Sequence, residues 1–223
     1  TLPGMRVRAK WKSAAKATAL GARVPQTELF VPLAVELCTG EQVTQGYYNK
    51  LQGERKMAIE RVRTYFQKFG MEDKILEFDV SSATVELAAK AVGCAPERIA
   101  KTMSFELADG CILIVAAGDA RIDNGKYKQT FHTKAKMVPA DKVEEKIGHS
   151  VGGVCPFGIN PGVKVYLDES LKRFQTVFPA CGSSNSAIEL TIEELERLSG
   201  SKDWVDVCKN WQGTVTESER KGK

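Results

Sequence analysis

After an irregular N-terminal stretch, the hydrophobic positions of the chain follow a regular pattern almost to its end. The first regular segment has apolar residues every three or four positions, at Ile59, Val62 and Phe66, so they fall on one helical face. Gly70 follows and is a typical helix stop, because glycine readily adopts the left-handed conformation. The pattern predicts an amphipathic helix over residues 59–69.

Further helices are predicted from the same period and from residues that start or stop helices. Thr191 and Glu194 form a capping box, in which the side chain of each residue bonds the backbone of the other. Ser81–Ser82 is the expected cap of an earlier helix, and Gly93 is its expected end. These helices cover residues 83–92, 123–131, 141–147 and 192–198.

Other segments alternate apolar and polar residues or form short apolar runs, which predicts strands. Residues 101–107 and 111–117 are joined through Asp109–Gly110, a strong hairpin signal because glycine accommodates the tight turn. Hairpins mixed with single helices predict an α+β domain with a mixed sheet. The remaining strands are expected over residues 75–78, 136–138 and 163–167, and on both sides of a small-residue turn at 181–186.

Composition and charge exclude several classes of protein. The 223 residues are 43% hydrophobic and 27% charged, with no apolar run near the length of a membrane span. Residues 57–223 hold 23 basic and 24 acidic side chains, so they lack the broad positive field of a protein that grips long nucleic acid. We therefore expect no membrane and no DNA partner, whereas a local contact with an RNA end is compatible with this charge.

The six cysteines form no Cys-x-x-Cys pair and show no zinc-like spacing with the two histidines. Several lie in apolar runs, as Cys111 does, which is typical of buried reduced thiols. The start of the chain is basic, but no sustained apolar segment follows it. We expect a cytoplasmic protein with no metal and no other cofactor.

Residues 1–56 differ from the rest, with no clear period and with 9 basic and 4 acidic side chains. The run at residues 52–56, Gln-Gly-Glu-Arg-Lys, is rich in residues that purine-only codons encode, as a translated ribosome-binding site would be. We expect Met57 to be the natural start, preceded by an upstream-translation artefact or a poorly ordered extension, with the functional domain over 57–212 and a polar tail over 213–223. A genuine small N-terminal region is the alternative, and an N-terminal mass measurement on protein from the native host decides between them.

The segment Val151–Gly158, Val-Gly-Gly-Val-Cys-Pro-Phe-Gly, carries the strongest functional signal. Three glycines and a proline disfavour both a helix and a central strand. They favour a loop in which the backbone approaches another molecule closely, since glycine has no Cβ to hold a ligand away. Pro156 restricts its own φ and the conformation of Cys155, so the loop is expected to be rigid as well as open.

Two other segments accompany this loop. Ala100–Phe105 is a predicted strand with Lys101 near its start, and Phe178–Leu190 contains a Gly/Ser turn closed by Ile-Glu-Leu. In this order the three segments resemble the YbaK/EbsC family, free-standing relatives of the editing domain of bacterial prolyl-tRNA synthetase. The resemblance runs from about Ile59 to Trp204. It implies a partly closed, barrel-like mixed sheet surrounded by helices, and the activity of an aminoacyl-tRNA deacylase.

The resemblance also implies a site. Lys101 matches the essential lysine of the family, whose charge would hold a phosphate or hydroxyl of the terminal adenosine. The glycine loop matches the loop that cradles the aminoacyl group, where backbone N–H groups can stabilise an oxyanion. The expected catalytic residues are Lys101, Gly152, Gly153 and Pro156, and the expected substrate-binding residues are Thr102, His149, Val154, Cys155, Phe157, Gly158, Gly182, Ser183 and Ser184.

Two features of this site have more than one interpretation. Ser183 and Ser184 either orient a water or the ribose, or make only local hydrogen bonds in their turn. Cys155 with His149 suggests a thiol nucleophile, but no third residue that would orient the pair is evident. A packed cysteine is therefore the expected alternative.

Two departures from the cysteinyl-tRNA deacylases of the family concern the substrate. Ala187 stands where those carry an acidic residue, and Ile159 stands where some relatives carry a histidine. We expect a trans-acting deacylase of mischarged aminoacyl-tRNA, acting on tRNA for proline that carries a small uncharged amino acid. Its partners would be the tRNA 3′ end, contacted transiently, and an aminoacyl-tRNA synthetase. The alternatives are a non-catalytic module that binds an aminoacyl or nucleotide-like ligand, and a cysteine-dependent protein.

Overall fold

The computed structural model describes residues 57–212. The predictions for residues 1–56 and 213–223 lie outside the described residues. Residues 57–67 are helical, and Gly70 follows with a φ of +62°, which confirms the helix and the stop predicted there.

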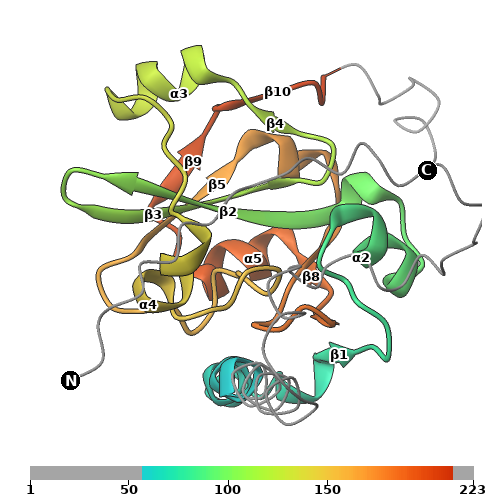
Figure 1. Ribbon diagram of the computed structural model, residues 1–223. Helices are drawn as coiled ribbons and strands as arrows, with labels where there is room; N and C mark the ends of the chain where they lie inside the picture. Colours follow the sequence, from blue (N-terminus) through green and yellow to red (C-terminus); the bar gives the residue numbers. More distant parts are fainter. Residues whose placement is uncertain (1–56, 213–223) are drawn as a thin grey trace, which may run out of the picture. The chain divides into compact units, whose positions relative to one another are not determined.

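A curled, mixed sheet forms the middle of the domain, with the long β2–β3 hairpin crossing it (Figure 1). The hairpin is antiparallel, and Leu107 lies opposite Gly110 as the Asp109–Gly110 turn predicts. The predicted α+β class and the barrel-like sheet are confirmed. In pairing order the strands are β8 (Leu190–Thr191), β6 (Thr176–Pro179), β2 (Ile99–Leu107), β3 (Gly110–Ala117), β5 (Lys164–Asp168) and β9 (Asp203–Val205).

Both directions of strand pairing occur in this sheet. β5 runs parallel to β3, β9 runs parallel to β5, and β6 runs parallel to β2, whereas β8 is antiparallel to β6. Residues 112–117 of the central strand β3 are all buried, so both faces of this strand are covered. A strand buried on both faces has an almost continuous apolar sequence, as Ile-Leu-Ile-Val-Ala-Ala shows here.

Local sequence signals predict some of the helix ends, but one predicted cap is wrong and the helix predicted over 141–147 is α-helical only from Val143. Thr191 and Glu194 form the predicted capping box. The predicted cap Ser81–Ser82 is wrong, because Thr84 caps the helix and accepts a hydrogen bond from the backbone N–H of Leu87. The α-helices are α2 (Val85–Val92), α3 (Asn124–Phe131), α4 (Val143–Ile147) and α5 (Ile192–Ser199), and the 3-10 helices are Glu72–Lys74, Pro96–Arg98, Ala140–Lys142 and Glu169–Arg173.

Several short pairings are not apparent in the sequence. The predicted strand at 136–138 is only a single bridge between Met137 and Phe105. Two-residue ladders have too few positions to show a period, so most of their members were not predicted. They join β1 (Leu76–Glu77) to β7 (Ser186–Ala187) and β4 (Arg121–Ile122) to β10 (Cys208–Lys209).

Candidate active site

A cavity of about 280 Å³ lies beside β2. Segments far apart in the sequence form its walls, and these include the N-terminal end of α2, the first six residues of β2 and the start of the glycine loop. The cavity-lining residues are Ser82, Ala83, Thr84, Val85, Ala88, Ile99, Ala100, Lys101, Thr102, Met103, Ser104, Met137, Val138, Ala140, Val143, Val151, Gly152, Val154, Phe178, Ala180, Ser186 and Ala187.

One edge of β2 is left open where it faces this cavity. β6 pairs with β2 only at Ile99 and Ala100, and the next contact on that edge is the hydrogen bond from the N–H of Val138 to the carbonyl of Ser104, at 3.0 Å. Alternate residues of a strand direct their backbone groups to the same edge. The N–H and C=O of Thr102 therefore point into the open stretch, where the described residues offer them no ladder partner.

The side chain of Thr102 adds a third polar group at this place. Its hydroxyl oxygen is buried and has no hydrogen-bond partner among the described residues. A buried hydroxyl without a partner costs free energy, so this group is available for a hydrogen bond with a molecule in the cavity.

Lys101 is held by the turn that follows β3. Its ammonium donates to the carbonyl of Gly118 at 2.9 Å and to the carbonyl of Ala120. Two of its three N–H donors are thereby used, and one is left for a ligand. Burial lowers the pKa of Lys101, and the nearby Cys208 and Asp119 partly oppose that effect.

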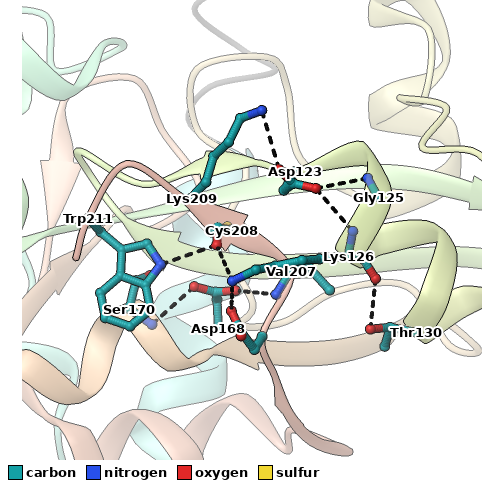
Figure 2. A network of polar contacts seen from close by, with 11 residues as sticks. Asp123, Gly125, Lys126, Thr130, Asp168, Ser170, Val207, Cys208, Lys209 and Trp211 are labelled. Carbon is teal, nitrogen blue, oxygen red and sulfur yellow. Dashed lines mark hydrogen bonds and ion pairs between the residues drawn. The ribbon is translucent and has the colours of Figure 1, made fainter.

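A polar network fixes the C-terminal segment beside this turn (Figure 2). The buried carboxylate of Asp168 accepts hydrogen bonds from the backbone N–H groups of Ser170 and Val207, each at 3.0 Å. The next residue, Cys208, begins β10 and pairs with β4, which directly follows Ala120. The network thus helps to hold the backbone at Ala120, whose carbonyl accepts a hydrogen bond from the ammonium of Lys101.

The glycines of the loop are required for close packing. Gly152 has a φ of +88°, and a Cβ there would lie 3.1 Å from the Cβ of Ala83 in the cavity wall. A Cβ on Gly153 would lie 2.6 Å from the carbonyl oxygen of Gly182 and 2.8 Å from the Cα of Ser183. The second glycine therefore packs against the Gly/Ser turn and does not face the cavity.

The cavity brings together only part of the predicted set. Lys101, Thr102, Gly152 and Val154 line it. The other predicted residues lie outside the lining, and they are Gly153, His149, Cys155, Pro156, Phe157, Gly158, Gly182, Ser183 and Ser184.

His149 and Cys155 are buried together beneath the loop. The Nε2 of His149 lies 2.8 Å from the carbonyl oxygen of Phe157, to which it donates, and 3.5 Å from the sulfur of Cys155. Burial raises the pKa of Cys155 to about 12, and burial lowers the pKa of His149. A thiol with such a pKa is almost wholly protonated near pH 7, so this pair is a poor nucleophile.

In the Gly/Ser turn, the hydroxyl groups of Ser183 and Ser186 are hydrogen-bonded within the turn. Ser183 donates to the side-chain oxygen of Asn185 at 2.9 Å and lies 2.7 Å from the hydroxyl of Ser186. The carbonyl of Ser184 accepts from the backbone N–H of Ser82 at 2.6 Å. This contact ties the turn to the segment before α2 and helps to shape the cavity wall.

The chemistry of the lining is almost uniform. Lys101 carries its one ionisable side chain, and the other lining residues are apolar, small or hydroxyl-bearing. Ala187, one of the two departures noted in the sequence, lies in the wall. Over residues 57–212 the structure has no group of three His, Cys, Asp or Glu side chains placed to hold a metal ion.

Two parts of the cavity were not predicted as site residues. Ser82–Val85 precede and open α2, and the segment from Met137 to Val143 links α3 to α4. Ser and Thr before a helix are ordinary capping residues, so they gave no signal that this segment lines a cavity. No local signal shows that residues 137–143 cross to the edge of β2.

The comparisons with known proteins agree with this geometry. The family model described as the aminoacyl-tRNA editing domain matches residues 80–198, a range that includes every residue of the cavity lining. The chain belongs to this family. The resemblance drawn from the lysine strand, the glycine loop and the Gly/Ser turn is confirmed.

Individual relatives extend the comparison. The uncharacterized protein YwhH of Bacillus subtilis (strain 168) is 57% identical over 157 residues, which are 70% of this chain and 100% of that protein. A solved structure described as a candidate trans-editing enzyme for prolyl-tRNA synthetase has 29% identity and a TM-score of 0.63, covering 68% of this chain and 97% of its own. The proline–tRNA ligase of Bacillus subtilis (strain 168) is 27% identical over 90 residues, which are 40% of this chain and 16% of the ligase.

Within the described residues, no helix is both long enough and apolar enough to cross a membrane.

Proposed function

We propose that this protein is a trans-acting editing hydrolase that deacylates mischarged aminoacyl-tRNA in the cytoplasm. One observation carries the proposal. The strand with Lys101, the loop with Gly152 and the strand with Ala187 meet around one cavity, inside the range that matches the editing domain.

The substrate we propose is tRNA for proline that carries a small uncharged amino acid. A cavity of about 280 Å³ is at the lower end of ligand pockets, which suits an aminoacyl group better than a whole nucleotide. A cationic amino acid would meet the ammonium of Lys101 and find no carboxylate in the lining. The matches to proline–tRNA ligases favour tRNA for proline.

The open edge of β2 provides groups that fit an aminoacyl ester. In our proposal the N–H of Thr102 polarises the ester carbonyl and its C=O accepts a hydrogen bond from the α-ammonium group of the amino acid. The backbone at Gly152 and Val154 closes over the other side. The N–H of Gly153 takes no part, because it donates to the carbonyl of Ser150 at 3.0 Å.

Hydrolysis of the ester then needs no protein nucleophile. A water oxygen attacks the carbonyl carbon, and the tetrahedral oxyanion is stabilised by backbone N–H groups. The bond to the ribose oxygen breaks, and that oxygen takes up the proton that the attacking water gives up, so the products are the free amino acid and the tRNA 3′ end. The remaining N–H of Lys101 would hold the ribose hydroxyl or the terminal phosphate, so the ester is positioned for attack.

A second candidate function is a binding module without turnover. It is favoured by the lining itself, in which the described residues include no carboxylate or imidazole to act as a general base. Such a module would retain aminoacyl-tRNA, or a nucleotide-like ligand, through the same backbone groups.

The experiment is a panel of labelled aminoacyl-tRNAs incubated with the full chain. We expect release of alanine or another small amino acid from tRNA for proline at least about tenfold faster than release of proline. The opposite result is a wild-type chain that releases no amino acid from any aminoacyl-tRNA of the panel and still retains a charged tRNA in a filter-binding assay. That result would contradict the hydrolase and support the binding module.

A further inference from the structure

A lysine-rich segment borders the cavity. We call residues 132–142, which connect α3 to α4, the lysine strap. It carries Lys134, Lys136 and Lys142. Figure 1 shows it descending from α3 past the β2–β3 hairpin to α4, while α2 lies towards the other end of the hairpin. Met137, Val138 and Ala140 of the strap line the cavity, so the strap forms one side of its mouth.

The strap carries an excess of positive charge. Residues 132–142 hold three lysines and one aspartate, and the ammonium of Lys136 pairs with Glu106. The rest of residues 57–212 hold 17 basic and 21 acidic side chains. A near-neutral domain therefore presents a local positive field where its ligand would enter.

Backbone hydrogen bonds fix the middle of the strap on β2. The N–H of Val138 donates to the carbonyl of Ser104 at 3.0 Å, and the N–H of Glu106 donates to the carbonyl of Lys136 at 2.8 Å. The side chain of Val138 is buried in the core. Lys134 and Lys142, on either side of this attachment, are thus held close to the mouth.

These two lysines are available to a ligand. The ammonium of Lys136 pairs with Glu106 at 2.7 Å, whereas Lys134 and Lys142 are exposed and have no ion pair among the described residues. Met137 stands between them with 60% of its surface exposed. An apolar side chain flanked by cations suits a nucleotide, which has an apolar base face and an anionic phosphate.

We propose that the lysine strap binds the RNA backbone next to the aminoacylated 3′ end. The inference rests on the proposed function, because an ester placed in the cavity requires the preceding nucleotides to leave through its mouth. Lys134 and Lys142 then neutralise phosphates of those nucleotides, and Met137 contacts a base. The strap determines how tightly RNA is held and leaves the ester chemistry unchanged.

The test compares two substrates of the full-length Lys134→Gln/Lys142→Gln variant. On aminoacyl-tRNA we expect KM to rise about fivefold or more with kcat within about twofold, and the plot of log KM against log salt to become shallower by roughly 1.4. On 2′(3′)-O-aminoacyl-adenosine, which has no phosphate, we expect no change. The matched control is Lys68→Gln/Lys202→Gln, which removes the same charge from two exposed lysines that have no ion pair among the described residues and do not line the cavity.

Several results would overturn the inference. If the strap variant has an unchanged KM for aminoacyl-tRNA, the strap is only a solvated surface. If the control variant shows an equal rise in KM, the effect comes from net charge. An equal loss on aminoacyl-adenosine would indicate a damaged cavity. An effect that depends on adding a synthetase would assign the strap to a protein partner.

Equilibrium binding separates this inference from the proposed function. If the wild-type chain hydrolyses nothing, filter binding of uncharged tRNA at several salt concentrations still tests the strap. Weaker binding with a shallower salt dependence, in the strap variant alone, supports it without turnover. Equal binding of tRNA by both variants and the wild type, or no binding by any, contradicts it.

Discussion

The two halves of the glycine loop differ in their surroundings. Val151, Gly152 and Val154 line the cavity, and Val151 is 61% exposed. Cys155 and Phe157 are completely buried a few residues later. The first half lines the cavity, and the second half anchors the loop to the core. A short loop can be both open and rigid when the two requirements fall on different residues.

The anchor is aromatic. The ring centroids of Phe157 and Phe66 are 4.8 Å apart, and Phe66 belongs to the helix of residues 57–67. His149 donates to the carbonyl of the same phenylalanine. Residues that the sequence marked as substrate-binding therefore lie where they support the loop, outside the cavity lining.

The largest expected effect comes from removing this anchor. Phe157→Ala leaves a cavity in a fully buried site and should lower the free energy of unfolding by about 3–5 kcal/mol, measured by denaturant titration. Val151→Ala, in the exposed half, is the control and should change it by about 0.5 kcal/mol or less. Similar losses for both variants would remove the distinction between the halves.

The next effect concerns the glycine between the halves. In Gly153→Val the new side chain must displace the backbone of Gly182 and Ser183, so we expect a loss of about 2–3 kcal/mol of unfolding free energy together with at least about tenfold lower turnover. Stability is read by thermal unfolding and turnover by deacylation. A variant with wild-type stability and no turnover would instead place this side chain in the cavity.

A smaller effect tests the buried thiol. Cys155→Ala should cost about 1 kcal/mol of unfolding free energy and leave kcat/KM within about threefold of wild type, because the thiol is buried and protonated. Deacylation with and without a thiol-blocking reagent gives the same information. Abolished turnover in a folded variant would restore the cysteine-dependent alternative.

The smallest effect concerns Glu106, which pairs with Lys136 of the lysine strap, and it depends on pH. Hydrogen bonds from Lys136 and then Lys146 lower the pKa of Glu106 to about 2 from an ordinary value of 4.5. A carboxylate with a lowered pKa stabilises the fold above its ordinary value, and this contribution is lost as pH falls towards 2. The difference in denaturant midpoint between wild type and Glu106→Gln should therefore narrow as pH falls from 4.5 towards 2. A difference that stays constant across this range would contradict the ion pairs.

Local signals predicted the parts of the fold that depend on neighbouring residues. Asp109–Gly110 placed the hairpin, and Thr191 with Glu194 placed the start of α5, because a turn or a cap is decided within a few positions. The choice of Thr84 over Ser81–Ser82 as a cap was missed. The N–H of Ser82 bonds the carbonyl of Ser184, a contact that no local pattern reveals.

The candidate site was predictable in outline and not in detail. The family resemblance was sufficient to predict that Lys101 and the start of the glycine loop lie at one cavity. It did not reveal that β6 leaves β2 after Ala100, which opens the edge at Thr102. Nor did it separate Gly152, in the wall, from Gly153, which packs against the Gly/Ser turn. Such distinctions depend on contacts between residues that are distant in sequence.

The most direct test of the proposed site is the single-turnover rate of Lys101→Ala on the best member of the aminoacyl-tRNA panel. Lys74→Ala serves as the control, because Lys74 lies on the 3-10 helix Glu72–Lys74, outside the cavity lining. We predict at least about tenfold slower release of the amino acid for Lys101→Ala, with cooperative thermal unfolding retained, and a wild-type rate for the control. A wild-type rate from a folded Lys101→Ala protein would contradict the assignment of this cavity as the site of deacylation.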